Sequence, residues 1–220
     1  REGMDAFAIE SLTRAQRAID NGLNQKEIAP VTIRTRRGER TVSVDEQPHK
    51  ANLEKIPQLR PAFAENGTIT PANSSSISDG ASALLLASEA AVEAHGLTAR
   101  ARIVAHSRNS LAPEAFTLAP IGAAEDVLAK AGWTVADVDL WEINEAFAMV
   151  TMLTMDALKL DPACVNVHGG ACAQGHPIGS TGSRIIVTLM HALEHYGKKR
   201  GVAALCIGGG EATAVAIELL

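Results

Sequence analysis

The chain has 220 residues, of which 46% are hydrophobic and only 3% aromatic, so it can bury a core built mainly from small aliphatic side chains. Its formal net charge of −5 and its single short basic cluster, at residues 34–40, exclude the basic face that a nucleic-acid-binding protein needs. No apolar run is long enough to span a membrane, and the N-terminal segment is acidic and amphipathic rather than signal-like.

The three cysteines, Cys164, Cys172 and Cys206, all lie in the last part of the chain. This is unlike the disulfide framework of a small secreted fold, so we expect free thiols in a reducing compartment. We therefore expect a cytoplasmic protein with neither nucleic-acid nor membrane partners.

The first half of the chain predicts two helices, a hairpin and a long loop. Apolar residues at helical spacing predict a helix over 2–21, and alternating apolar and polar residues predict a two-stranded hairpin over 31–44. Four prolines and a run of small polar residues predict an irregular loop over 45–80. The Ala- and Leu-rich stretch at 81–95 predicts a helix that is buried nearly all round.

The second half alternates between strand and helix patterns, which favours an α/β layer with mainly parallel pairing and a final hairpin. The predicted strands are 101–107, 138–143, 165–168, 202–207 and 212–219, and the predicted helices are 121–131, 145–159 and 180–196.

Reactive side chains are concentrated in three short segments, 144–148, 175–179 and 206–210. Each segment follows a predicted strand. Because the carboxyl ends of strands in an α/β sheet face the ligand crevice, we expect the three segments to converge on one site.

Two of these side chains suit proton transfer. His176 lies in a Gly- and Pro-restricted turn that leaves room for a substrate oxygen or a thiol, which favours general acid–base work. It could equally cap the helix that follows or satisfy a loop carbonyl. Cys206 ends a strand in front of three glycines whose amides could bind an oxyanion, although a cysteine there is more often a small core residue.

Three further patterns have both a functional and a structural interpretation. The Asn144 amide could orient a water, or it could simply cap the helix at 145–159. The serine-rich loop at 73–78 could bind amide or phosphate groups, or it could be a solvated linker. Cys and His recur every four residues from 164 to 176, but on a strand this spacing spans about 13 Å, too far for one zinc ion. We therefore expect no metal site.

Read together, the motifs resemble the thiolase family in order and spacing. The specific matches are NEAFA at 144–148, NVHGGACAQGHPIGSTGSR at 166–184 and CIGGGEATAVAIE at 206–218. Weaker matches are LRPAF at 59–63 and GTITPANSSSISDGASALLL at 67–86. The resemblance covers essentially the whole chain and identifies it as the C-terminal portion of a thiolase.

The resemblance implies a thiolase-type layered α/β domain with a mixed sheet at 97–220. Residues 1–96 would hold the remainder of the N-terminal half and part of an inserted loop domain. The expected reaction is Claisen condensation of acetyl-CoA, or thiolysis of 3-ketoacyl-CoA, by a ping-pong mechanism through an acyl-cysteine. Coenzyme A would be substrate and product, no cofactor would be bound permanently, and the full enzyme would be a homodimer or homotetramer.

Four residues match the family's catalytic positions. His176 would activate the nucleophilic cysteine and help to hold the thioester oxygen, and Cys206 would shuttle the α-proton of the second acyl group. Asn144 would position a water in one oxyanion hole, and the backbone N–H of Gly208 would donate in the other.

Four more match positions that contact coenzyme A. Ser75 would contact the pantetheine arm, and Phe116 and Phe147 would line its tunnel. His49 stands where many relatives have an arginine near the nucleotide end, which puts that contact in doubt.

Neither Cys164 nor Cys172 matches the family's nucleophile. We therefore expect this chain alone to be inactive, with an N-terminal thiolase domain as its missing partner. The alternative is a non-catalytic acyl-CoA-binding subunit or fragment of the thiolase type.

Overall fold

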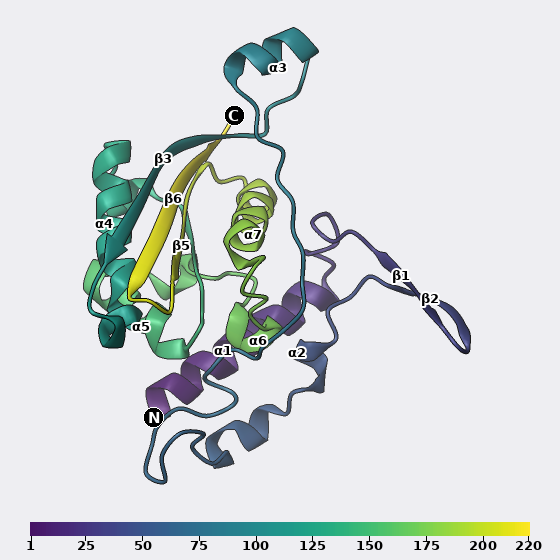
Figure 1. Cartoon of the computed structure of the whole chain (residues 1–220), viewed down its shortest axis with the longest axis vertical. Coiled ribbons are helices and arrows are strands. Elements are labelled where there is room, and N and C mark those ends of the chain that lie inside the picture. The colour runs from purple at the N-terminus through teal and green to yellow at the C-terminus, as the bar shows by residue number, and fades with distance from the viewer.

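A four-stranded mixed sheet forms the centre of the computed structural model, which describes all 220 residues (Figure 1). Its strands are β3 (Ala101–Ser110), β4 (Leu140–Ile143), β5 (Arg200–Cys206) and β6 (Glu211–Leu219), in the order β3-β6-β5-β4. Only β4 and β5 pair in parallel. The prediction of mainly parallel pairing is therefore wrong, because β6 returns antiparallel to β5 and separates it from β3.

Helices cover both faces of this sheet, α4 (Ala119–Ala131) on one side and α7 (Thr181–Tyr196) on the other (Figure 1). Both helices end at a glycine in the left-handed conformation, which stops a helix without steric cost. Side chains alternate along β5, so Val202 and Ala204 pack towards α4 whereas Ala203 packs towards α7. The predicted helices at 121–131 and 180–196 and the final hairpin are confirmed.

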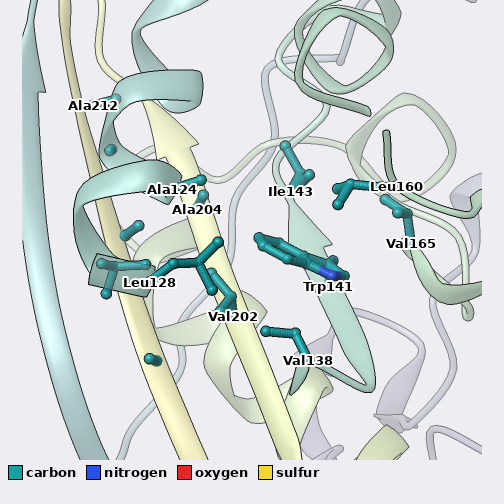
Figure 2. Packing of buried hydrophobic residues seen from close by; sticks show 14 of the residues in the cluster. Ala124, Leu128, Val138, Trp141, Ile143, Leu160, Val165, Val202, Ala204 and Ala212 are labelled. Carbon is teal, nitrogen blue, oxygen red and sulfur yellow. The ribbon is translucent and has the colours of Figure 1, made fainter. Parts of the chain in front are cut away.

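The larger core lies between α4 and the sheet (Figure 2). Leu128 of α4 packs against Val202, and Trp141 and Ile143 of β4 extend the cluster towards Leu160. Burying one such side chain contributes about 1.5–3 kcal/mol, so this cluster fixes the position of β4 and of the loop that follows it.

The N-terminal helix α1 (Glu2–Asp20) packs on α5 (Ala148–Leu158) and on the short α6 (Ala171–Gln174). The contact with α6 is close at Gly169, whose φ is +79° and where a Cβ would lie 2.5 Å from the Ser11 carbonyl oxygen. A glycine is therefore required at this position. The helix predicted at 2–21 is confirmed.

The hairpin predicted at 31–44 is also confirmed, as β1 (Val31–Thr35) paired antiparallel with β2 (Gly38–Val42). It projects away from the sheet (Figure 1). The loop predicted at 45–80 is irregular apart from one turn of helix, α2 (Gln47–Lys50), and a 3-10 helix, η1 (Leu53–Gln58). Further 3-10 turns are η2 (Pro113–Leu118), η3 (Val135–Asp137) and η4 (Pro162–Cys164).

The helix predicted at 81–95 is wrong in length and in burial. Only α3 (Glu89–His95) is helical, and none of its residues is buried. The Ser88 hydroxyl accepts a hydrogen bond from Ala91 N, which fixes the start of the helix there. Residues 81–88 are not helical, and the side chains of Leu85 and Leu86 are 87% and 71% exposed.

The strand predicted at 165–168 is wrong, because only Val165 forms a bridge, with Trp141. Asn166 leaves the strand conformation with φ of +47°, and its side chain bonds to both backbone groups of Ile143. The Asn166 side-chain amide thus makes the two hydrogen bonds to Ile143 that the backbone of a continuing strand would have made. The helix predicted at 145–159 begins only at Ala148.

No helix of the chain combines the length and apolar character that a membrane crossing requires.

Candidate functional site

The carboxyl ends of β4 and β5 bring two of the predicted site residues to the same edge of the sheet. Ile143 pairs with Ala204, and Asn144 N donates to the Ala204 carbonyl at 2.9 Å. Cys206 lies two residues further along β5. The parallel register therefore places Asn144 and Cys206 on neighbouring strand ends.

His176 reaches the same place from a different loop. Its ring Nε2 lies 3.4 Å from Asn144 Nδ2, and its ring Nδ1 lies 2.6 Å from the hydroxyl of Thr181 at the start of α7. Its backbone N donates to the Ser76 carbonyl at 3.0 Å. The segment 175–179 follows α6, so the prediction that it follows a strand is wrong. The His176 ring nevertheless contacts Asn144 at the end of β4.

The capping interpretation of Asn144 is wrong, because α5 begins three residues later than predicted and its N-cap is Phe147. The Asn144 side chain is buried, and its amide oxygen has no hydrogen-bond partner. A buried amide oxygen without a partner can accept a bond from a water or from a ligand.

Burial acts on both proton-transfer candidates. It lowers the pKa of His176, and the positive charge of Arg184 lowers it further, so the ring is neutral at pH 7. Burial also raises the pKa of the Cys206 thiol to about 11. The imidazole is therefore the available base, and Cys206 becomes a thiolate only when a proton acceptor is beside it.

Cys206 is buried, as the core interpretation required, yet it belongs to none of the three apolar clusters. The turn after it exposes Gly208, where a Cβ would meet open space. The N–H of Gly208 has no backbone partner. It is therefore free to donate to an oxyanion, as the resemblance implies.

Three of the four residues predicted to contact coenzyme A lie beside the loop that follows β4. Ser75 donates to the Ala146 carbonyl through both its backbone N and its hydroxyl, each at 3.0 Å. The rings of Phe116 and Phe147 meet edge to face, with centroids 6.1 Å apart.

His49 is not joined to this group by a direct contact. It lies on α2, and its ring pairs with Asp20 at 3.4 Å. The first residue of the same helix, Gln47, accepts a hydrogen bond from Ser76 at 2.9 Å, which ties α2 to the serine-rich loop.

The sequence predicts Glu145 in the first turn of a helix, but the structure buries its side chain between α1 and α6, beside the site. Its carboxylate is fully buried and accepts from Ser11 Oγ at 2.7 Å, Asn166 Nδ2 at 2.8 Å and Cys172 N at 3.0 Å. Burial raises its pKa. The only signal in the sequence was a charged residue between two apolar segments.

The Cys and His residues that recur every four positions face different partners. The Cys172 thiol contacts the Glu145 carbonyl at 3.8 Å, whereas the His168 ring packs against His195 and Tyr196. His176 faces Asn144. The chain contains no group of three His, Cys, Asp or Glu side chains arranged to hold a metal ion.

Two family models match the chain, the thiolase N-terminal domain at residues 1–90 and the thiolase C-terminal domain at residues 97–219. The chain is therefore not confined to the C-terminal domain. The expectation that it is the C-terminal portion, with the N-terminal thiolase domain as a missing partner, is wrong. That the chain lacks the nucleophilic cysteine stays a prediction.

Several acetyl-CoA acetyltransferases and thiolases are similar over the whole chain. Identity is 48% to the acetyl-CoA acetyltransferase of Yarrowia lipolytica, 46% to the cytosolic acetyl-CoA acetyltransferase of Mus musculus and 42% to the mitochondrial 3-ketoacyl-CoA thiolase of Bos taurus. Each alignment covers 99% of this chain and 54%, 56% and 55% of the relative, respectively. The chain thus spans about half the length of these relatives.

Solved structures agree with the sequence matches. The acetyl-CoA acetyltransferase of Bacillus anthracis superposes with a TM-score of 0.96 at 42% identity, and a thiolase of Ascaris suum in complex with coenzyme A superposes with 0.89 at 40%. Both alignments cover 100% of this chain and 56% of the other. They confirm the predicted layered α/β fold with a mixed sheet, and together with the two domain matches they show that the chain belongs to the thiolase family.

Proposed function

We propose that this chain supplies the acid–base and oxyanion-binding groups of an acyl-CoA acyltransferase of the thiolase type. The observation that carries the proposal is the meeting of a neutral His176 ring with the buried Asn144 amide, at the strand ends that also carry Cys206. General acid–base and oxyanion groups that converge on one point suit acyl transfer at a thioester carbonyl.

The substrate is a coenzyme A thioester. Two contacts support this substrate: Ser75 bonds to the loop after β4, and the Phe116 and Phe147 rings pack together. A pair of aromatic side chains suits the narrow, largely apolar pantetheine arm. The names of the Yarrowia lipolytica and Mus musculus relatives favour acetyl transfer over the cleavage of long 3-ketoacyl chains. We place the enzyme in the cytoplasm, as the name of the mouse relative does, and we expect the full enzyme to be a homodimer or homotetramer.

His176 carries the proton transfers in this mechanism, and Cys206 handles the α-proton. His176 Nε2 takes the proton from a nucleophilic cysteine other than the three cysteines of this chain, and the resulting thiolate attacks the thioester carbonyl. When the carbon–sulfur bond to coenzyme A breaks, His176 returns the proton to the leaving thiolate. In condensation, His176 then takes the proton of the Cys206 thiol, and the Cys206 thiolate removes an α-proton from the second acetyl group. The carbanion attacks the acyl-cysteine carbonyl, the carbon–sulfur bond to the nucleophilic cysteine breaks, and the released cysteine thiolate takes the proton from His176.

The oxyanions that form in these steps need two separate sets of donors. The His176 ring, while it carries a transferred proton on Nε2, and a water held by Asn144 stabilise one negative oxygen, and the free N–H of Gly208 stabilises the other. Cys206 loses its proton only when an acceptor stands beside it, because burial raises its pKa to about 11.

The test is thiolysis of acetoacetyl-CoA and of a long-chain 3-ketoacyl-CoA by the natural gene product that contains this chain. We expect His176→Ala and Cys206→Ala each to lower kcat by about 10²–10⁴-fold. Cys164→Ala is the matched control and should keep its activity, since this thiol lies in η4 outside the site. Turnover that survives both site substitutions would contradict the proposal.

A non-catalytic acyl-CoA-binding subunit is the second candidate. It is favoured by the protonated state of Cys206, whose raised pKa makes it a poor base without a partner. Binding of coenzyme A without turnover by the natural gene product would support this candidate.

A further inference from the structure

We propose that Thr181 is a positioning residue that fixes the tautomer of His176, so that its Nε2 stays unprotonated and faces the substrate. The inference deepens the proposed function and rests on it for its catalytic meaning. It concerns a residue that neither the sequence motifs nor the oxyanion geometry singled out.

The contact between the two side chains is short and buried. Thr181 Oγ1 lies 2.6 Å from His176 Nδ1, and Thr181 is fully buried in the first turn of α7. The same hydroxyl also lies 3.0 Å from the Pro177 carbonyl oxygen. A hydroxyl has only one proton to donate, so these two contacts cannot both be donated by Thr181.

The Pro177 carbonyl favours one direction for the hydroxyl proton. Its oxygen accepts from Ser180 N and Thr181 N, at 2.8 and 2.9 Å, and also from the Thr181 hydroxyl. A hydroxyl that donates to this carbonyl leaves its oxygen to accept from the ring, and Nδ1 of His176 then carries the hydrogen. In a neutral imidazole only one nitrogen is protonated, so Nε2 keeps its lone pair.

An independent contact on the other side of the ring agrees. Nε2 lies 3.4 Å from the amide nitrogen of Asn144, which is a donor and requires an acceptor. The ring is thus held between an acceptor on Nδ1 and a donor on Nε2. Both contacts favour the same tautomer.

The backbone leaves the ring little other freedom. His176 N is bonded to the Ser76 carbonyl, and the residue forms a parallel bridge with Ile77. At Gly175, a Cβ would lie 2.0 Å from Ser78 Oγ, so the chain approaches the serine-rich loop closely just before the histidine. Because the backbone is fixed, the Thr181 hydroxyl controls the remaining choice, which is the proton position on the ring.

Two factors lower the pKa of the His176 ring, burial and one charged group. The charged group that acts on it is Arg184, from the same helix as Thr181, and its positive charge together with burial favours the neutral ring. A neutral ring has a tautomer to fix, whereas an imidazolium does not. The hydroxyl therefore acts on the form that the site holds at pH 7.

The experiment is long-range ¹H–¹⁵N correlation spectroscopy of the chain labelled with ¹⁵N-histidine, at a pH where His176 is neutral. The chain has seven histidines, and the signals lost in His176→Gln assign the ring. We expect a single tautomer with hydrogen on Nδ1 in the natural chain. We expect Thr181→Ser to preserve it, and Thr181→Val to lose it to a mixture of both forms.

Thr188→Val is the matched control, because Thr188 is another buried threonine on α7 and makes no hydrogen bond to His176. Its tautomer signals should equal those of the natural chain. Hydrogen on Nε2 in the natural chain, or an unchanged tautomer in a folded Thr181→Val, would overturn the inference. If Thr181→Val does not fold, the natural chain and Thr181→Ser decide the question on their own.

The readout needs no coenzyme A and no turnover. A failure of acyl transfer with the Nδ1–H tautomer intact would therefore count against the proposed function and leave the role of Thr181 standing. In the natural gene product, Thr181→Val should lower kcat for thiolysis more than it raises KM, and Thr181→Ser should restore kcat.

Discussion

Asn166 uses its whole side chain to hold β4 and the buried carboxylate of the site together. Its amide oxygen accepts from Ile143 N at 2.8 Å, and its amide nitrogen donates to the Ile143 carbonyl and to Glu145, each at 2.8 Å. Its backbone has φ of +47°, which glycine tolerates and alanine does not. The side-chain and backbone contributions can therefore be measured separately.

We predict that Asn166→Gly lowers the free energy of unfolding by about 3 kcal/mol, because it leaves several buried polar groups without partners. Asn166→Ala should cost about 1 kcal/mol more, since the left-handed backbone then carries a Cβ. Urea denaturation measures both values. Asn21→Ala, which removes one exposed bond to Arg17 O, is the control and should change stability by less than about 0.5 kcal/mol. Equal costs at both asparagines would refute the role given to Asn166.

Glu142 is a second residue whose contribution to the free energy of unfolding can be isolated, because that contribution depends on pH. It is fully buried on β4, and burial raises its pKa from 4.5 to about 8; Arg184 opposes this shift, while Glu145 and Glu27 add to it. The Arg184 guanidinium lies 4.0 Å away, at the limit of an ion pair, and does not offset the loss of solvation. The carboxyl is therefore largely protonated at pH 7.

The folded chain consequently holds a proton on Glu142 over a pH range in which the unfolded chain has lost it. This contribution is fully present below about pH 4.5 and disappears as the pH rises to about 8. We predict that Glu142→Gln gains stability relative to the natural chain by roughly 2–4 kcal/mol between pH 5 and pH 8. Urea midpoints at the two pH values test this. His168 and His176 titrate in both proteins and cancel. A difference that does not change with pH would mean that Glu142 is already ionised at pH 5.

At the scale of elements, periodic patterns predicted well and composition alone predicted poorly. The helices α1, α4 and α7 and the β5–β6 hairpin have apolar spacing that matches their burial, so the sequence places them almost to the residue. The helix at 81–95 was predicted only from its many Ala and Leu residues. Composition of this kind does not determine whether a segment is helical or which of its side chains are buried. The prediction of a strand at 165–168 was wrong because the Asn166 side chain, instead of a strand backbone, bonds to Ile143 N and O. No pattern in the sequence indicates such a side-chain contact.

The segment between the serine-rich loop and α3 can be tested by amide exchange. No backbone N–H of residues 81–88 makes a hydrogen bond, whereas every ladder position of β5 pairs with a neighbour. We predict that amides at 81–88 exchange within seconds and that those of β5 are protected by a factor of about 10³ or more. Hydrogen exchange followed by mass spectrometry measures both peptides in one experiment. Protection of 81–88 equal to that of β5 would show that this segment is paired in solution.

At the scale of the whole molecule, the site combines segments that are far apart in the chain. Ser76 and His176 are bonded across 100 positions, and Ser11 and Glu145 across 134. Residue types and motif order pointed to His176, Cys206 and Asn144, but only the fold shows that Thr181 contacts His176 and that Glu145, the neighbour of Asn144, is buried. Long-range partners of this kind are set by packing, which no local window of sequence contains.

Several large apolar side chains are exposed on the molecular surface. Leu85 and Leu86 are exposed next to each other, and an apolar groove of about 230 Å³ lies between α7 and the sheet, where Ile186 and Leu205 form part of its lining. Apolar surface that is contiguous and accessible drives association in water. We therefore predict that the chain self-associates at micromolar concentration.

The pair Leu85→Lys and Leu86→Glu tests whether this segment is responsible, since it removes two exposed apolar side chains without changing the net charge. We expect less light scattering and weaker binding of a hydrophobic fluorescent dye, with an unchanged urea midpoint because neither residue is buried. The matched control is Val31→Lys with Ile33→Glu, which makes the same charge change on exposed apolar residues of the β1–β2 hairpin. If the hairpin variant disperses the chain as well as the leucine variant does, association is a property of the general apolar surface. If only the leucine variant does so, the exposed stretch at 81–88 is the contact.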